Sequence, residues 1–471
     1  MSAALWAPDY WLSRLVFQRG LALVYLVAYI AAARQFRPLI GANGLTPAPR
    51  TAAALPFRTA PSLFHWRYSD RMFAIAAWTG AVLAAAALGG VTDRLPVVAC
   101  MAVWAVLWAL YLSIVNVGGT WYGFGWEILL LEAGFLAIFT GPAGVAPPVA
   151  VLWMLRWLLF RLEFGAGLIK MRGDPCWRDL TCLDHHHETQ PMPGPLSWFF
   201  HHLPAPLHRV ECAANHFAQL IVPFALFAPQ PAAAVAAAVM IVTQVWLLLS
   251  GNFAWLNVLT IVLALPVLGD AAWRHVLPVP RPDALAAPGW FALLGLVVAV
   301  ALAALSYRPV RNMLSSRQLM NASFDGLHLV NTYGAFGSVS RRRLEVVVEG
   351  TAEAEPEDWR AYEFHGKPTD PRRWPRQFAP YHLRLDWAMW FAALSRDYAR
   401  PWFGTLLHRL LDADPATLRL LRADPFEGAR PAAVRASLYE YRFSSWRRLR
   451  AERVCWTRTR LGVYWPAVRR D

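Results

Sequence analysis

The chain has 471 residues, of which 57% are hydrophobic and only 16% are charged, whereas soluble proteins carry roughly 25% charged residues. This composition excludes a disordered chain, a coiled coil and a small disulfide-bonded scaffold, and it predicts that most of the protein faces lipid. The net charge of +14 is weak support for a nucleic-acid ligand, because it comes almost entirely from arginine, with lysine only at Lys170 and Lys367. We expect no nucleic-acid partner.

Apolar stretches long enough to cross a bilayer recur up to residue 307. A transmembrane helix needs about 20 mainly apolar residues, and the sequence indicates about nine such spans, with eight or ten as alternatives. The first follows Arg14 and Arg19 and resembles a secretory signal, but its long, Trp-rich lead-in favours an uncleaved anchor. The predicted spans cover residues 15–33, 72–89, 95–116, 122–140, 148–168, 211–228, 232–250, 253–269 and 289–307.

Two polar loops interrupt this predicted transmembrane domain of residues 1–307. Residues 34–71 are rich in Pro, Arg and Gly and contain a tight turn at 41–47. Residues 171–208 hold Pro, His, Trp and two Cys, and they are too polar to span. Within them, residues 195–202 carry aromatic side chains of the kind found at the level of the lipid headgroups.

Ionisable side chains lie inside the fourth and fifth predicted spans. Such a group at bilayer depth costs about 2.5–3.5 kcal/mol, so it is a functional candidate unless it is paired. Three of them recur every seven residues and form one stripe on a helix. We expect Arg156 or Arg161 to pair with a glutamate of the fourth span, either to lock the bundle or to contact a substrate. The candidates are Glu127, Glu132, Arg156, Arg161, Glu163 and Lys170.

Residues 184–191 contain the densest group of polar side chains. Imidazoles with a carboxylate can bind zinc or transfer protons near neutral pH. Consecutive histidines cannot all point at one centre, however, and the spacing is not HExxH. Metal binding, acid–base chemistry and a structural role that ties the loop to the membrane domain are the alternatives, and we expect no resident metal or cofactor. The candidates are His185, His186, His187, Glu188 and Gln190.

Cys176 and Cys182 flank a short turn in the same loop. Asp174 can cap a helix that Pro175 opens. The five residues between the cysteines permit a disulfide, and two unconnected thiols are the equal alternative. The sequence contains no Gly-rich phosphate loop, nucleophile elbow or nucleotide fingerprint, so no catalytic residue is assigned.

After residue 307 the composition changes, and residues 308–471 are predicted to form a water-facing domain. The fold class that follows is a polytopic α-helical membrane bundle followed by a C-terminal α+β extramembrane domain. Strands are predicted at 328–333, 343–349, 359–364, 436–443 and 454–464, and helices at 384–394, 401–411 and 415–422.

Several runs resemble the lipase maturation factor family and keep their order along the chain. They lie at residues 126–137, 156–162, 173–175, 187–191, 331–337, 345–351 and 377–394. The resemblance implies a polytopic membrane protein that, in animals, resides in the endoplasmic reticulum and helps secreted dimeric lipases to fold and assemble. It transfers no catalytic residue. In the C-terminal domain the matching candidates are Asn331, Tyr333, Phe336, Lys367, Arg384, Asp386, Trp387 and Trp390.

A folding or assembly factor is therefore the leading hypothesis, with the lipid bilayer and a lipase-like client as partners. The helical spacing of Trp387 and Trp390 favours core packing over contact with a client. The Ala- and Arg-rich composition suggests a bacterial homologue in the cytoplasmic membrane. Loop arginine counts place the polar loops in the cytoplasm, whereas the family resemblance places them outside.

The alternative is an integral membrane enzyme that acts on a lipid or quinone-like ligand. A fainter resemblance to the transmembrane module of vitamin K-dependent γ-carboxylase favours it, resting on residues 44–47 and on the architecture. The enzyme hypothesis requires one cavity lined by Glu127, Arg156, Glu163 and the histidine-rich residues 184–191, here called the histidine loop.

Overall fold

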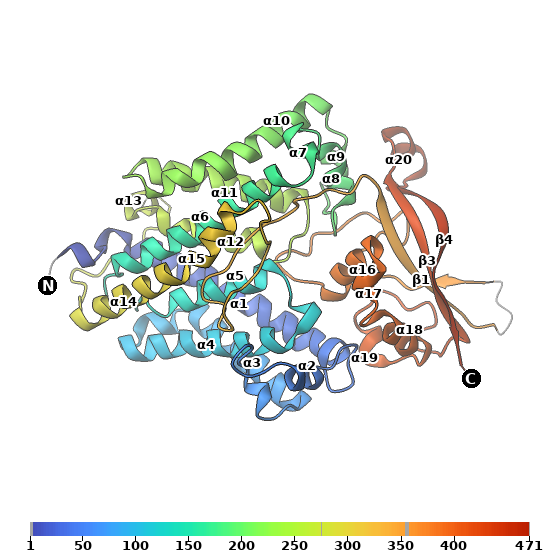
Figure 1. Cartoon of the computed structure of the whole chain (residues 1–471), viewed down its shortest axis with the longest axis horizontal. Coiled ribbons are helices and arrows are strands. Elements are labelled where there is room, and N and C mark those ends of the chain that lie inside the picture. Colours follow the sequence, from blue (N-terminus) through green and yellow to red (C-terminus); the bar gives the residue numbers. More distant parts are fainter. Residues whose placement is uncertain (1–2, 275, 354–357, 471) are drawn as a thin grey trace.

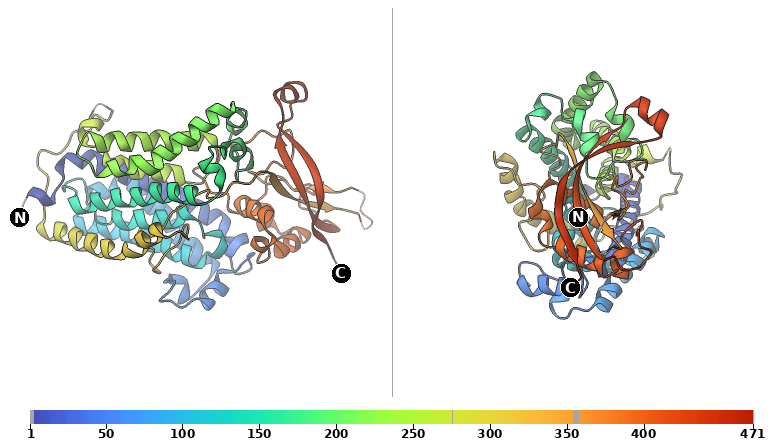
Figure 2. Two further views of the ribbon diagram at one scale, coloured as in Figure 1. Left: turned by 45° about the horizontal axis from the view of Figure 1, so that its top comes forward. Right: turned by 90° about the vertical axis from the view of Figure 1, so that its right-hand side faces the viewer.

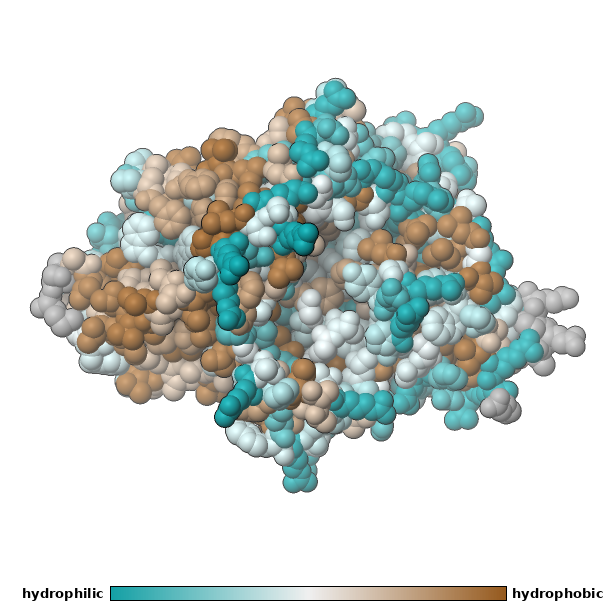
Figure 3. All heavy atoms as spheres, viewed as in Figure 1, coloured by the Kyte–Doolittle hydropathy of each residue, from teal (hydrophilic) through white to brown (hydrophobic). Residues whose placement is uncertain are grey.

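A long helical bundle lies beside a smaller domain that contains the sheet (Figure 1). The computed structural model describes residues 3–274, 276–353 and 358–470. The N-terminal end of the chain lies at the end of the bundle away from the sheet, and the C-terminus lies beyond the sheet (Figures 1 and 2). The visible face of the bundle is mainly hydrophobic, whereas hydrophilic residues predominate over the smaller domain (Figure 3).

The longer helices of the bundle run roughly parallel to one another (Figure 2). One of them changes from α10 to a π-helical turn and then to a 3-10 helix before it ends at Phe227. The bundle helices are α1 Trp11–Ile40, α3 Asp70–Leu88, α4 Val97–Val117, α5 Gly125–Ala137, α6 Val149–Arg172, α10 Ala205–His216, α11 Ala232–Ser250, α12 Leu256–Ala264, α14 Gly289–Leu305 and α15 Tyr307–Leu314.

Six helices in the described part of the chain are long and apolar enough to cross a membrane, so the predicted count of nine spans is not confirmed. The six are Pro8–Ile40, Asp70–Leu88, Val97–Val117, Ala205–Phe227, Ala232–Ser250 and Gly289–Leu314.

The three remaining predicted spans correspond to α5, α6 and α12, which pack against one another. Helix α5 has 13 residues, and at 1.5 Å per residue it reaches only about 20 Å. Helix α12 with its 3-10 extension ends at Val267 and is also short. Helix α6 has 24 residues but carries five charged side chains. Hydropathy does not distinguish an apolar helix that is buried inside a protein from one that faces lipid. The sequence therefore predicts all three helices as spans.

The polar loops fold into short helices. Asp174 accepts a hydrogen bond from the Cys176 amide (3.0 Å) and caps the helix that Pro175 opens, as the sequence predicts. Trp198 is completely buried and donates to the Ser444 carbonyl (3.0 Å), so the expectation that this segment lies among lipid headgroups is wrong for Trp198. The short helices are α2 Ala48–Ala54, α7 Pro175–Arg178, α8 Leu183–Thr189, α9 Ser197–His201 and α13 Asp270–Trp273.

The C-terminal domain is built on an antiparallel sheet in the order β2-β1-β3-β4. Val346 of β1 lies opposite Leu438 of β3, and Tyr441 of β3 lies opposite Arg458 of β4. Helix α16 packs against β1. The elements are β1 Arg343–Thr351, β2 Arg360–Ala361, α16 Arg384–Leu394, α17 Arg396–Ala399, α18 Phe403–Leu411, α19 Pro415–Leu418, β3 Ala433–Phe443, α20 Trp446–Glu452 and β4 Trp456–Arg469.

One predicted strand is wrong. Residues 328–333 form no strand of the sheet and make one isolated bridge, between Asn331 and Ser323. The backbone amide of Asn331 instead donates to the carboxylate of Glu132 (3.1 Å), a side chain of the bundle. A segment with alternating apolar residues forms a strand only where a neighbouring strand pairs with its backbone N–H and C=O groups.

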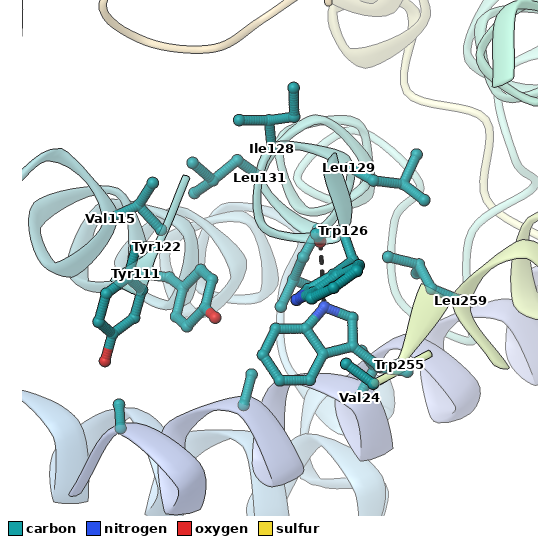
Figure 4. Packing of buried hydrophobic residues seen from close by; sticks show 14 of the residues in the cluster. Val24, Tyr111, Val115, Tyr122, Trp126, Ile128, Leu129, Leu131, Trp255 and Leu259 are labelled. Atoms are coloured by element: carbon teal, nitrogen blue, oxygen red, sulfur yellow. Dashed lines mark hydrogen bonds between the residues drawn. The ribbon is translucent and has the colours of Figure 1, made fainter. Parts of the chain in front are cut away.

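A single cluster of buried apolar side chains continues from the bundle into the C-terminal domain. Trp126 of α5 packs against Trp387 of α16, with ring centroids 4.8 Å apart. On the bundle side, the Trp255 indole donates to the Trp126 carbonyl (3.0 Å), and Val24, Leu129 and Leu259 surround this contact (Figure 4). The two domains therefore share a core rather than meeting through solvent.

Candidate functional site

Glu132 of α5 is the centre of a buried group that joins α5, α6 and the segment after α15. Arg161 of α6 forms an ion pair with it, which confirms the predicted pairing between these two helices. The Tyr333 hydroxyl (2.8 Å) and the Asn331 side-chain amide (3.0 Å) donate to the same carboxylate. Arg161 also donates to the Asn331 carbonyl (2.7 Å). One Glu132 oxygen and the Arg161 guanidinium thus hold residues 331–333 on the bundle.

Gly165 of α6 allows that segment to lie directly on the helix. A Cβ at this position would be 2.7 Å from the Tyr333 carbonyl oxygen, closer than van der Waals contact permits. The family-like sequence around residue 331 and the glycine of α6 therefore belong to one contact, although 166 residues separate Gly165 from Asn331 in the chain.

Glu127 pairs with the C-terminal domain and not with α6. Arg384 at the start of α16 donates to Glu127 (2.6 Å) and to the Trp121 carbonyl (2.6 Å), and the Tyr111 hydroxyl donates to the second Glu127 oxygen. The Arg384 guanidinium lies 3.6 Å from the centre of the Tyr122 ring. Glu127 and Arg384 are both completely buried. Of the two glutamates of α5, Glu132 thus has the predicted partner on α6, and Glu127 has its partner in the C-terminal domain.

His382 lies beside this ion pair as a neutral imidazole. Burial and the adjacent Arg384 cation lower the pKa of His382 to about 4. Its Nδ1 accepts a hydrogen bond from the Trp126 indole (3.3 Å). The carbonyl of His382 accepts from Gln35 of α1 (2.7 Å), and the Arg384 amide donates to the Gln35 oxygen (3.0 Å). The turn before α16 is therefore fixed to α1 as well as to α5.

The side chains of the histidine loop point in different directions, as expected for consecutive residues. His186 packs edge-on against Phe336 (4.8 Å between centroids), and burial holds the pKa of His186 well below its usual range. His187 lies 3.5 Å from Glu211 of α10. His185 is half-buried, and its carbonyl accepts from the Thr189 hydroxyl (3.0 Å).

The end of the same loop contacts the C-terminal domain. Glu188 accepts a hydrogen bond from the Phe443 amide of β3 (2.6 Å). Gln190 donates to the Ser250 carbonyl at the end of α11 (2.7 Å). Trp390 of α16 donates to the Thr189 carbonyl (3.0 Å). These contacts favour a structural role for residues 184–191, which connect the helical bundle to the C-terminal domain.

Arg343, Glu345 and Lys367 form a buried charged triad, of which only Lys367 is a candidate from the sequence. Lys367 lies 3.0 Å from the Glu345 carboxylate, and Arg343 pairs with the other oxygen. Arg343 also donates to the Glu188 carbonyl (2.8 Å). Arg343 is the last of three consecutive arginines, a pattern that is typical of a solvent-exposed segment. The signal that could have identified the triad is the i, i+2 spacing of Arg343 and Glu345, which places both on one face of a strand.

Glu163 and Lys170 belong to a separate polar group within the bundle. Gln244 of α11 (2.7 Å) and Gln219 (3.1 Å) donate to Glu163. Lys170 donates to Gln219 (2.8 Å) and Asn215 (2.7 Å). Amide side chains from the neighbouring helices thus satisfy both charges, and the seven-residue stripe of α6 is divided among different partners.

Arg156, the third member of the stripe, lies nearer the opposite end of α6. It donates to the Leu226 carbonyl and to the Tyr10 hydroxyl, both at 3.1 Å. Glu127, Arg156, Glu163 and the histidine loop therefore do not line one cavity, and the condition set for the enzyme hypothesis is not met.

Cys176 and Cys182 form a disulfide. With Asp174 they make up the group of His, Cys, Asp and Glu atoms in the described residues that lies close enough together to hold a metal ion, within 4.8 Å. A metal would need the thiolates, and here both sulfur atoms are bonded to each other. This group is accordingly a covalent clamp on the turn after α6.

Asp386 of α16 gives a testable pH dependence. It is buried and accepts a hydrogen bond from the Gly366 amide (2.5 Å), and burial raises the pKa of Asp386 from 3.8 to about 6. The folded state thus favours the protonated acid, and this contribution to stability, complete below about pH 4, is lost as the pH rises through 6.

We expect Asp386→Asn to stabilise the protein by about 1–3 kcal/mol at pH 7.5 and to have little effect at pH 4. Asparagine keeps the oxygen that accepts from Gly366 but carries no charge. Thermal unfolding of both proteins across this pH range measures the difference. A variant that is destabilised at pH 7.5 but not at pH 4 would show that the ionised carboxylate stabilises the folded protein, and it would contradict this prediction.

The chain is similar to known proteins over its whole length. Residues 12–275 match the family described as "Lipase maturation factor transmembrane domain", and residues 329–466 match "Lipase maturation factor C-terminal domain". Lipase maturation factor 1 of Bos taurus is 42% identical, with 100% of this chain and 91% of the relative covered. Lipase maturation factor 1 of Homo sapiens is 40% identical (99% and 89% covered), and lipase maturation factor 2 of Homo sapiens is 28% identical (92% and 80%). No solved structure matches the chain.

Both parts of the chain thus match the same family in the same order, and the described apolar helices are those of a multi-pass membrane protein. The chain belongs to the lipase maturation factor family.

Proposed function

We propose that this protein assists the folding or assembly of an exported, lipase-like client at the membrane. The observation that carries the proposal is the similarity to lipase maturation factor 1, at 42% identity over 100% of the chain. The Glu127 and Glu132 groups lie within the two matched ranges of the chain. The client itself is inferred from what the relatives are named for.

The arrangement of the two domains supports a scaffold rather than a catalyst. Glu127 and Glu132 of α5 and Arg161 of α6 are buried and hold residues that follow the bundle, and the hydrophilic surface of the C-terminal domain lies beyond the apolar bundle (Figure 3). Such a protein presents a fixed folded surface at the edge of the bilayer. We propose that the candidate residues of both domains act by positioning this surface, and that the functional division of the chain falls near residue 307.

We propose a bacterial cytoplasmic membrane as the host, on the basis of the composition. An Ala- and Arg-rich chain with lysine at two positions favours a bacterial cytoplasmic membrane, with the C-terminal domain on the outer side, where an exported client passes.

The experiment is a complementation assay. Full-length protein is expressed with a secreted dimeric lipase in animal cells that lack their own lipase maturation factor, and lipase activity per amount of secreted lipase is measured. We expect activity to rise above that of cells with an empty vector, and the bovine relative serves as the positive control. Unchanged lipase activity in cells that contain the intact, membrane-inserted protein would contradict a lipase client.

A further inference from the structure

A cavity of about 310 Å³ opens in the half of the bundle that lies away from the C-terminal domain. Its wall comes from the segment before α1, from the first turns of α6 and from the turn between α10 and α11. In Figure 1 the N-terminal end of the chain marks this end of the molecule. The side chains that matter for its chemistry are Tyr10, Trp153, Arg156, Phe227 and Gln230.

Arg156 is the cation of this cavity, and it has no protein anion. The residue is 8% exposed, and no carboxylate of the described residues lies within ion-pair distance of it. Of the other buried arginines, Arg161, Arg343 and Arg384 each pair with a glutamate, whereas Arg14 donates to a backbone carbonyl and lines no part of this cavity. The two hydrogen bonds of Arg156, to Leu226 and Tyr10, use two of the five N–H groups of a guanidinium.

The rest of the wall is apolar and aromatic. The Arg156 guanidinium lies 5.1 Å from the centre of the Trp153 ring, and that ring stacks on Phe227 at 6.0 Å. Trp153 is 41% exposed and stands at the rim. The cavity thus combines one charged fork with surfaces that water solvates poorly, a combination that suits an amphipathic anion better than a small hydrophilic one.

Its depth fits the boundary between headgroups and acyl chains. Arg156 follows the first residue of α6 by seven positions, which corresponds to about 10.5 Å along the helix. An unpaired arginine at this depth is costly, and an arginine fork pairs with a phosphate through two parallel hydrogen bonds. Exposed tryptophan at the same level is typical of the membrane interface.

We propose that this cavity binds the headgroup of an anionic phospholipid, with the phosphodiester on Arg156 and the glycerol and first acyl carbons against Trp153 and Phe227. The same phosphate chemistry is offered by free inorganic phosphate, which lacks the apolar portion that the wall accommodates. The site therefore assigns the lipid as the occupant. It is separate from the residues that join the bundle to the C-terminal domain, and its test does not depend on the client.

Native mass spectrometry of the full-length protein in detergent tests the proposal, with phosphatidylglycerol and phosphatidylcholine titrated separately. We expect phosphatidylglycerol to bind at least about tenfold more tightly, and Arg156→Gln to lower that affinity by about tenfold, because a charge-assisted hydrogen bond is lost. Ala228 lines the cavity and is half-buried. Ala228→Phe fills the cavity without touching the hydrogen bonds of Arg156, and it should lower the affinity to a similar extent.

Arg94 provides the matched control, since it is an exposed arginine on the turn that follows α3, outside the cavity. Arg94→Gln should leave lipid binding unchanged. Unchanged phosphatidylglycerol affinity in both cavity variants, with their melting transitions intact, would overturn the proposal. Displacement of the lipid by millimolar inorganic phosphate from the wild-type protein would overturn the assignment to a lipid and identify a free-phosphate site.

Discussion

Replacing Glu127 with glutamine is expected to lower the free energy of unfolding by about 3–5 kcal/mol, because it leaves a buried guanidinium without its counter-ion. Arg384 and Glu127 are both fully buried, and their contact joins α16 to α5. Burial disfavours the Arg384 cation, but the Glu127 carboxylate outweighs that effect and raises the pKa of Arg384. A guanidinium keeps its proton at neutral pH even without a partner, so Arg384 stays charged in the variant and cannot relieve the loss by releasing a proton.

A denaturant titration of the full-length protein in nanodiscs measures this effect. Glu452→Gln is the matched control, because Glu452 makes the same kind of contact with Arg448 (2.8 Å) on the exposed helix α20. That variant should unfold like the wild type. In the double variant Glu127→Gln/Arg384→Met, the loss should be smaller than the sum of the two single losses by about 1 kcal/mol or more. Additive single losses would mean that the two charges do not stabilise each other.

Glu345→Gln should destabilise the protein at pH 7 by a similar amount, about 3–5 kcal/mol, since the triad then holds two cations and no anion. All three side chains are nearly inaccessible to solvent. Burial lowers the pKa of Lys367 to about 8, an effect that Glu345 partly offsets. Removing the carboxylate lowers that pKa further, so Lys367 can lose its proton while Arg343 keeps its charge.

The pH dependence of this variant distinguishes the triad from simple packing. Between pH 8 and 10.5 the unfolded chain binds the Lys367 proton more strongly than the folded one, so the contribution of Lys367 to stability rises with pH. At pH 9 the wild-type lysine is already largely neutral, and the difference between variant and wild type should shrink. Thermal unfolding at pH 7 and pH 9 measures both differences, and an equal difference at the two values would rule out a charge effect.

Much of the fold follows from patterns along the chain. The alternation at 343–349 and the spacing at 384–394 correctly predict β1 and α16, because each element buries a face that its own sequence defines. The pair Arg161 and Glu132 is predictable since adjacent antiparallel helices bring few opposite charges together. That reasoning does not reach the partner of Glu127, since Arg384 lies 257 residues away. No local spacing indicates which arginine of a distant helix will reach it.

The sequence likewise predicts which residues belong to the candidate site but not how they are arranged in space. Glu163, Lys170 and Arg156 share a helical stripe, but Glu163 and Lys170 meet at Gln219 whereas Arg156 contacts Leu226 and Tyr10, because α6 contacts different elements along its length. The histidine loop is rich in groups that can perform chemistry, yet Phe336 and Glu211 cover two of its imidazoles. The residue types show which buried charges need a partner inside the bundle. The tertiary contacts determine which partner each charge has.

Hydrogen–deuterium exchange of the full-length protein in nanodiscs tests most directly whether Glu127 and Glu132 hold separate pieces of the C-terminal region on the bundle. The Asn331 amide donates to Glu132, and the Arg384 amide donates to Gln35 while the Arg384 side chain pairs with Glu127. In the wild type, residues 329–333 and α16 should both exchange slowly. Glu132→Gln should speed exchange in residues 329–333 and leave α16 protected, whereas Glu127→Gln should affect α16 first. Exchange of both segments at the rate of exposed loops in the wild type would contradict the account.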